Sequence, residues 1–358
     1  EKHREMGLLE KANALATVQE EFTTKQGVRL FGEVADGGSE AICHNAVLEE
    51  IGEPGQLIIG SDSHTCTAGA LGAFAFGVGA TDIANAWYTN DIRVVVPKVV
   101  RVDLTGILPE HVSAKDVMLK ILADPYIKEG RSIGQVLEFA GEGIAAMNMD
   151  ERATLTNMAV EGGATTGIIA ADEVTVEYLK AYGRWDEAMR DSFLRSDDDA
   201  DYVHRFEIDL SQLRPMVATP GDPRNGIFLD QLEATTGGPV KIDIAYGGSC
   251  TGGKMTDMDM YASVLSRALK LGLTVSPGVQ LYIQFGSQII KKYAENKGYI
   301  ELFRQAGASL INPSCGACIR AGPGVSANSG QITVSAINRN FPGRSGPGSV
   351  YLASPLVV

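Results

Sequence analysis

Hydrophobic positions recur along the chain with helical spacing in some segments and as short apolar runs in others, which predicts alternating helices and strands. Helices are predicted at 2–22, 113–122 and about 256–271, with Ser113 as a suitable N-cap. The run 68–87 is rich in Gly and Ala, which predicts a helix whose backbone packs closely against its neighbours. Strands are predicted at 56–60, 93–104 with an interruption at Pro97, 168–171, 239–247, 281–284 and 309–311. This alternation is typical of α/β layers with parallel sheets, in which loops at the carboxyl ends of strands form the site.

The composition is that of a soluble globular protein. The chain has 358 residues, of which 44% are hydrophobic and 21% charged, and this length predicts two to three domains. No apolar run approaches the ~20 residues that a membrane span needs, and the N-terminal segment lacks the apolar core of a signal peptide. We therefore expect a cytoplasmic protein, or one of the mitochondrial matrix if eukaryotic. The sequence begins without Met and ends on an apolar run, so we expect a fragment of a longer polypeptide.

The charge balance disfavours two classes of partner. A formal net charge of −13 repels phosphate backbones and anionic lipid, so we expect neither nucleic acid nor a membrane as a partner. The polar and acidic segment 178–201 is interpreted as a solvated surface. An anionic small molecule would have to be bound by a local cationic pocket.

Five cysteines carry the first candidate chemistry: Cys43, Cys66, Cys250, Cys315 and Cys318. An odd number in an intracellular-looking chain disfavours a disulfide framework. The CxxC pair at 315–318 is compatible with zinc, a redox dithiol, an iron-sulfur cluster or a plain loop. Its place after a late strand weakens the thioredoxin interpretation, and zinc would need a further ligand such as Cys66 or a His. Three thiolates suffice for a cluster only if one iron has no protein ligand, and such an iron is an open Lewis acid.

A second set of polar residues follows a predicted strand end. Asp62, Ser63 and His64 come directly after the strand at 56–60, and His44 precedes it. A carboxylate and an imidazole two residues apart can both point into a cleft, where the Asp fixes the tautomer of the His. The alternative is a capping Asp beside a structural His.

Two arginines provide the candidate cationic pocket. Arg339 and Arg344 lie five residues apart across a Pro-Gly turn and can converge on carboxylates as bidentate donors. Taken singly, either arginine is more often a partner in a surface ion pair.

Nucleotide binding is disfavoured by two incomplete motifs. Residues 248–254 match G-x-x-x-x-G-K, but Met255 follows and the hydroxyl is displaced to Thr256. The glycines of 69–79 do not complete G-x-G-x-x-G, because Asp82 occupies the last position.

Several motifs in register resemble one family. The segments at 60–74 and 77–82, GSCT at 248–251, CGAC at 315–318 and NRNFPGR at 338–344 are similar to the aconitase superfamily. The resemblance is closest to its isopropylmalate dehydratase and homoaconitase large subunits, and it covers nearly the whole chain. It implies three-layer α/β/α domains with largely parallel sheets around a central iron-sulfur cleft, without the family's swivel domain. We place the domains at 1–116, 117–215 and 216–358.

The resemblance also implies a site. Cys250, Cys315 and Cys318 would hold a [4Fe-4S] cluster, with Asn338 beside it. The active-site hydrogen-bonding groups would be His44, Asp62, Ser63 and His64, with Asn157 and Glu161 as cleft residues near the cluster. Arg339 and Arg344 would bind substrate carboxylates. The family usually has Asn after its Cys-Thr pair, so Gly252 and Gly253 predict the loss of one cleft contact.

The reaction implied is reversible dehydration of a hydroxy polycarboxylate through an unsaturated acid. The expected substrate is 3-isopropylmalate, interconverted with 2-isopropylmalate in leucine biosynthesis; the alternatives are citrate or homocitrate, as in aconitase and homoaconitase. His64 with Asp62, and His44, would protonate the departing oxygen, and Glu161 would position water. The base would be a serine of the swivel domain, which would be either a separate small subunit or a further part of the same polypeptide. Outside this class, a P-loop protein and a non-catalytic binding protein remain alternatives.

Overall fold

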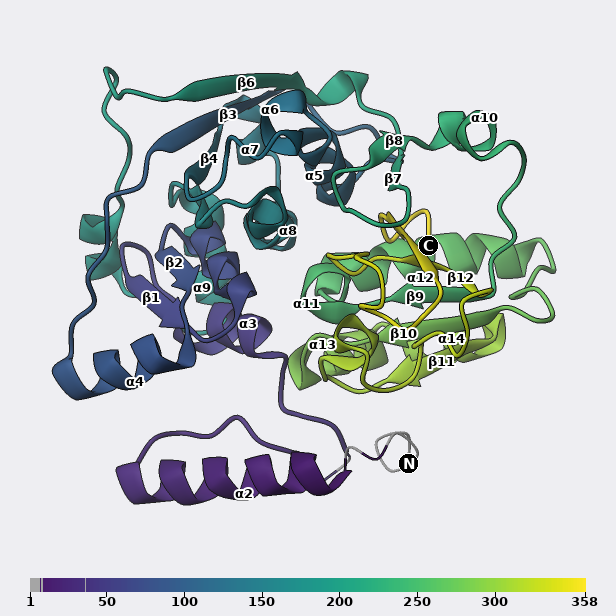
Figure 1. Cartoon of the computed structure of the whole chain (residues 1–358), viewed down its shortest axis with the longest axis horizontal. Coiled ribbons are helices and arrows are strands. Elements are labelled where there is room, and N and C mark those ends of the chain that lie inside the picture. The colour runs from purple at the N-terminus through teal and green to yellow at the C-terminus, as the bar shows by residue number, and fades with distance from the viewer. Residues whose placement is uncertain (1–6, 8, 36) are drawn as a thin grey trace.

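The computed structural model describes residue 7, residues 9–35 and residues 37–358. Its first element is α2 (Leu9–Gln26), which has no buried residue and runs along the lower edge of Figure 1. Stacking of the Phe22 and Trp87 rings at 5.3 Å connects α2 to a later helix. Residues 2–6 and 8 of the predicted first helix lie outside the described residues, and the helix continues past the predicted end at Phe22. In this described part of the chain, no helix combines the length and apolar character needed to cross a membrane.

A small layer of two parallel strands follows α2. The single helix predicted over 68–87 is wrong, because that run is divided among a 3-10 helix, a strand and an α-helix. Gly72 has a φ of 81° and ends the 3-10 helix in a left-handed turn. Close packing of the small residues is nevertheless present, since a Cβ on Gly69 would lie 1.9 Å from the carbonyl oxygen of Gly167. The elements are α3 (Cys43–Ala46), the π-helical turn η1 (Val47–Ile51), β1 (Leu57–Gly60), η2 (Ser63–Leu71), β2 (Phe74–Gly77) and α4 (Ala80–Thr89).

The middle of the chain forms a four-stranded parallel sheet in the order β5-β4-β3-β6. The strand predicted at 93–104 starts only at Val99, because Pro97 has no N–H for a sheet ladder. The helix predicted at 113–122 is confirmed with its cap, since Ser113 Oγ accepts a hydrogen bond from Lys115 N at 3.2 Å. The strands are β3 (Val99–Thr105), β4 (Val136–Ala140), β5 (Thr166–Ile169) and β6 (His204–Asp209). The helices are α5 (Ala114–Leu122), α6 (Pro125–Lys128), α7 (Glu142–Ala145), α8 (Met149–Asn157), η3 (Met158–Gly162), α9 (Glu173–Ala181), η4 (Glu187–Ser192) and η5 (Leu210–Gln212).

The last third of the chain forms a seven-stranded sheet in the order β11-β10-β9-β12-β13-β7-β8. Five of its strands are parallel, and the β7-β8 hairpin adds two antiparallel strands at one edge. Its strands are β7 (Met216–Ala218), β8 (Gly226–Phe228), β9 (Ile244–Gly247), β10 (Gln280–Gln284), β11 (Ala308–Ile311), β12 (Ile332–Ser335) and β13 (Ser349–Ala353). Its helices are η6 (Leu229–Gln231), α10 (Leu232–Thr236), α11 (Ser249–Gly252), α12 (Met255–Lys270), α13 (Gln288–Asn296), α14 (Tyr299–Ala306) and η7 (Gly316–Ile319).

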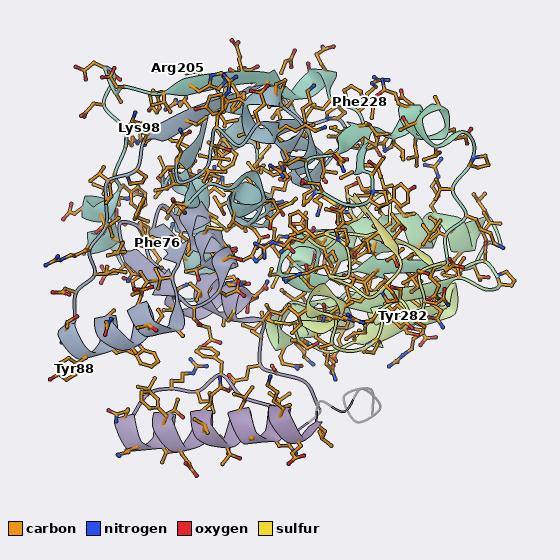
Figure 2. All side chains as sticks on the ribbon, viewed as in Figure 1. Phe76, Tyr88, Lys98, Arg205, Phe228 and Tyr282 are labelled. Carbon is orange, nitrogen blue, oxygen red and sulfur yellow. The ribbon has the colours of Figure 1, made fainter. Side chains whose placement is uncertain are left out.

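The three sheets confirm an α/β architecture with largely parallel strands. They group the strands as 57–77, 99–209 and 216–353. The domain boundaries at 116 and 215 stay a prediction; of the two, only the second coincides with a change of sheet. Figure 2 shows Tyr282 on the third sheet and Phe76 on the first, on either side of the central region.

One hydrophobic core joins the middle and third sheets. It contains Val102 and Leu119 from the middle layer together with Tyr246, Cys318 and Leu352 from the third. Because Cys318 is part of this core, the cysteine loop is anchored where the two sheets meet. Loops from β1, β9 and β11 and the end of α8 meet in the same region, and they carry the candidate site.

Candidate active site

Two histidines and a carboxylate come together at the end of β1. Asp62 is the N-cap of η2, and its Oδ1 accepts a hydrogen bond from His64 N at 2.8 Å. The same oxygen lies 3.0 Å from His44 Nε2 and 3.4 Å from His64 Nδ1. Asp62 therefore caps a helix and orients both imidazoles at once. A cavity of about 170 Å³ opens beside this group.

Glu161 holds the other side of His64. Its Oε1 lies 3.0 Å from His64 Nε2 and accepts a hydrogen bond from Arg339 Nε at 2.7 Å. Arg339 in turn donates from Nη2 to Ser63 Oγ at 2.8 Å. One continuous chain of polar contacts thus joins the segments around residues 63, 161 and 339. These segments lie far apart in the sequence, and only the family resemblance predicted that they share one site.

The charges in this chain favour a protonated His64. The hydrogen bonds from His44 and His64 hold the pKa of the Asp62 carboxyl well below its usual range. Burial opposes a charge on His64, but the Glu161 and Asp62 carboxylates outweigh it and raise the pKa of the imidazole. Burial would likewise raise the pKa of Glu161, yet His64 and Arg339 lower it. The two carboxylates therefore favour the imidazolium form of His64, which is the form that can donate a proton to a leaving oxygen.

The three predicted cluster cysteines lie on two loops that follow β9 and β11. Cys250 and Cys318 are buried, and Cys315 is exposed. The side-chain amide of Asn157 donates to Cys250 Sγ at 3.3 Å, and that of Asn338 donates to the same sulfur at 3.6 Å. Asn338 also contacts Cys318 Sγ through its Oδ1, at 3.4 Å.

The donor set at these cysteines fits an iron-sulfur cluster better than a single zinc ion. Among the described residues, one group of three metal-ligating side chains has its atoms within 4.8 Å of one another. It consists of His44, Asp62 and His64, in which Asp62 Oδ1 already contacts both imidazoles. The three cysteines are spread more widely, whereas one zinc with bonds of about 2.3 Å would hold its sulfurs about 3.8 Å apart. Burial raises the pKa of the Cys250 thiol to about 12, so a thiolate there requires a strong local positive charge such as iron. Several irons spread over the three sulfurs would supply it.

The two predicted substrate arginines lie at different places in the site. Arg339 is bonded to Glu161, whereas Arg344 lies beside Cys318. Within the described residues, the buried atoms Arg344 Nε and Glu161 Oε2 have no hydrogen-bond partner. A buried free donor and a buried free acceptor suit a ligand with carboxylate and hydroxyl groups. Their convergence on one substrate stays a prediction.

Sequence analysis missed a buried lysine behind the site. Lys115 is 2% exposed, and its Nζ donates to the carbonyl oxygens of Ala336, at 3.2 Å, and Ile337. It thereby holds the backbone that leads into Asn338. A signal existed, because Lys115 shares one helical face with Leu119 and Leu122, and that face is buried.

The second lysine of this region argues against nucleotide binding. Lys254 Nζ donates to the carbonyl of Thr251 and pairs with Asp257 Oδ2 at 2.8 Å. A P-loop lysine must instead reach the β- and γ-phosphates. Because Lys254 is 2% exposed and already paired, it stabilises the Cys250 loop from within the protein.

Glu49 on η1 is a buried carboxyl at the edge of the site, and burial changes its pKa. Its Oε1 accepts a hydrogen bond from Ser287 Oγ at 2.8 Å, and burial raises the pKa of its carboxyl to about 8. Between about pH 4.3, the pKa of the unfolded carboxyl, and about pH 8 the folded state holds a proton that the unfolded state has lost, so the free energy of unfolding falls as pH rises through this range. We expect Glu49→Gln to raise the free energy of unfolding by about 1–3 kcal/mol at pH 8, with a gain that shrinks toward pH 5.

Urea denaturation at pH 5, 6.5 and 8 checks this expectation. The matched control is Glu50→Gln, because Glu50 is exposed and pairs with Arg29. A gain from Glu49→Gln that is the same at all three pH values would show that the carboxyl is not protonated in the folded protein.

Comparison with known proteins gives consistent matches over the whole chain. Residues 4–358 match the model of the aconitase family, described as aconitate hydratase. The 3-isopropylmalate dehydratase large subunit 1 of Pyrococcus furiosus is 40% identical over 94% of this chain and 76% of its own length. The 3-isopropylmalate dehydratase large subunits of Campylobacter hominis and Aquifex aeolicus are 41% and 39% identical, each over 96% of this chain and over 78% and 76% of their own lengths.

Proposed function

This chain belongs to the aconitase family, and from that premise we propose that it is the large subunit of a hydro-lyase that interconverts 3-isopropylmalate and 2-isopropylmalate in leucine biosynthesis. The observation that carries the proposal is the chain of contacts from His44 through His64 to Arg339, next to three cysteines. The substrate rests on the names of the three relatives, whose matches cover most of both chains.

We propose that Cys250, Cys315 and Cys318 hold a [4Fe-4S] cluster. When bound through three thiolates, such a cluster supplies one iron that acts as a Lewis acid on the substrate hydroxyl. The amide donors of Asn157 and Asn338 support this assignment, because hydrogen bonds to a ligating sulfur stabilise its negative charge.

The protonated His64 is the group that donates to the leaving oxygen. Asp62 faces Nδ1 of its ring and Glu161 faces Nε2, so the donated proton has to leave one of these two contacts when the substrate is bound. His44, bonded to Asp62, is positioned as a second donor. In the reverse direction the same imidazole removes a proton from the attacking water.

Arginine side chains bind the carboxylates of the substrate. Arg339 is oriented by Ser63 and Glu161, and Arg344 lies beside Cys318. Two guanidinium groups at fixed positions hold a dicarboxylate and stabilise the negative charge that develops as the C–H bond breaks.

A small-subunit partner supplies the base that accepts the C–H proton. The relatives are named as large subunits, which supports a partner for this chain. We therefore expect the isolated chain to be inactive.

Formation of the unsaturated acid tests these assignments. The chain is reconstituted anaerobically with iron and sulfide, and alkene absorbance is followed with and without a small subunit of the same family. We expect turnover of isopropylmalate only in the presence of the partner. Faster turnover of citrate or homocitrate would instead support an aconitase or homoaconitase, and turnover by the isolated chain would contradict the role of the partner.

A further inference from the structure

The order of strands places one side chain between the two cysteine loops. In the third sheet β10 lies between β11 and β9, and all three strands are parallel. Cys250 follows β9, and Cys315 follows β11. The last residue of β10, Gln284, therefore lies between the starts of both loops and is fully buried, with 0% exposure.

The amide of Gln284 bonds to both loops at once. Its Oε1 accepts hydrogen bonds from the backbone N–H of Ser249, at 3.1 Å, and from Tyr246 Oη, at 2.8 Å. Its Nε2 donates to Ser314 at the carbonyl oxygen, 2.7 Å away, and at Oγ, 3.0 Å away. Ser249 and Ser314 directly precede Cys250 and Cys315, so one side chain connects the two ligand-bearing segments.

The backbone of each cysteine loop has a feature that depends on a contact from a neighbouring element. Ser249 has a φ of 69°, a left-handed conformation that costs free energy for a residue with a Cβ. On the other loop, a Cβ at Gly316 would lie 2.9 Å from Gln284 Nε2 and 2.8 Å from Tyr246 Oη. Glycine at 316 is thus what allows the amide to reach the loop between Cys315 and Cys318.

We propose that Gln284 is a positioning residue that fixes the distance between the Cys250 loop and the Cys315 loop. This inference rests on the proposed cluster. Gln284 is not itself a ligand of the cluster or of the substrate, but it holds the two loop backbones at the separation that the ligating cysteines need. None of the motifs at the cysteines or the arginines includes Gln284, so its contribution follows from the sheet order and the four hydrogen bonds.

Gln284→Glu tests the proposal with a side chain of the same shape. An ionised glutamate still accepts from Ser249 and Tyr246 but cannot donate to Ser314. Because burial keeps a carboxyl such as Glu49 protonated up to about pH 8, cluster loss is measured at about pH 9. We expect the reconstituted chain to lose its visible cluster absorbance at least about tenfold faster in the presence of a chelator. The matched control is Gln280→Glu on the same strand, where exposed Gln280 only accepts from Tyr282 Oη, a bond that glutamate keeps.

A milder second variant separates positioning from folding. Tyr246→Phe removes one donor to Gln284 and leaves both bonds to Ser314. We therefore expect cluster loss about two- to fivefold faster, while the cluster-free chain remains folded and its unfolding midpoint falls only by the effect of one buried hydrogen bond. Wild-type rates of cluster loss in both variants would overturn the proposal. It would also be overturned if Gln284→Glu lost its cluster only because the chain unfolds, while Tyr246→Phe lost its cluster at the wild-type rate. Absence of a cluster from the wild-type chain would instead refute the proposed function, so the two failures are distinguishable.

Discussion

Cys250→Ser is expected to abolish cluster binding and to lower kcat of the assembled enzyme by at least about a thousandfold, because the Lewis acid contributes several kcal/mol to breaking the C–O bond. Cys250 accepts hydrogen bonds from two asparagine amides, Asn157 and Asn338, which a free thiol in a buried loop would not require. The measurement is iron and sulfide per chain after anaerobic reconstitution, together with the rate of alkene formation.

Cys66→Ala is the matched control for the cysteine variant. Cys66 is a fully buried thiol in the same region, but its Sγ donates to the backbone carbonyl of Asn157 and has no assigned ligand role. We expect this variant to keep the cluster and most of the activity. Equal loss of the cluster in both variants would mean that the effect comes from general destabilisation, and retention of a full cluster in Cys250→Ser would remove Cys250 from the ligand set.

Glu161→Gln is expected to lower kcat by about a hundred- to thousandfold, the range of general acid catalysis. The Glu161 carboxylate raises the pKa of His64, so its removal lowers that pKa. His64 must be protonated to donate, and activity falls as pH rises through its pKa. The alkaline limb of the kcat/KM profile should therefore move to lower pH in the variant. Stopped-time assays of alkene formation between pH 6 and 9 measure the shift.

The control for this prediction is Glu142→Gln at the exposed start of α7, where the carboxylate accepts only from Gly106 N. Its pH profile should match the wild type. A Glu161→Gln enzyme that loses activity without any displacement of the alkaline limb would contradict the link between Glu161 and the protonation of His64.

The parts of the fold that could be predicted are those with a strong local signal. α5 has a serine cap and a clear apolar face, and both its start and its end were predicted. In contrast, Phe206 is the one buried residue of β6, and the other side chains of this strand are partly or fully exposed. No apolar run in the sequence therefore indicates β6. The prediction of one helix over 68–87 is wrong because small residues are compatible with an α-helix, a 3-10 helix and a tight connection between strands. The left-handed conformation of Gly72 ends the 3-10 helix and so excludes a continuous helix.

From local sequence alone, the contacts of the site could be predicted only between functional residues that lie close together in the chain. Asp62 and His64 are two residues apart in the chain, and their contact follows from the helix cap. The bond between Glu161 and Arg339 joins residues 178 positions apart and depends on tertiary packing. Gln284 is the last residue of β10, and nothing in its immediate sequence says that its amide connects two loops.

Iron and acid-labile sulfide analysis of the anaerobically prepared chain shows whether Cys250, Cys315 and Cys318 hold a [4Fe-4S] cluster. We expect about four irons and four sulfides per chain, with one iron removed first by a mild oxidant because it has no thiolate. One zinc per chain with no sulfide would contradict it.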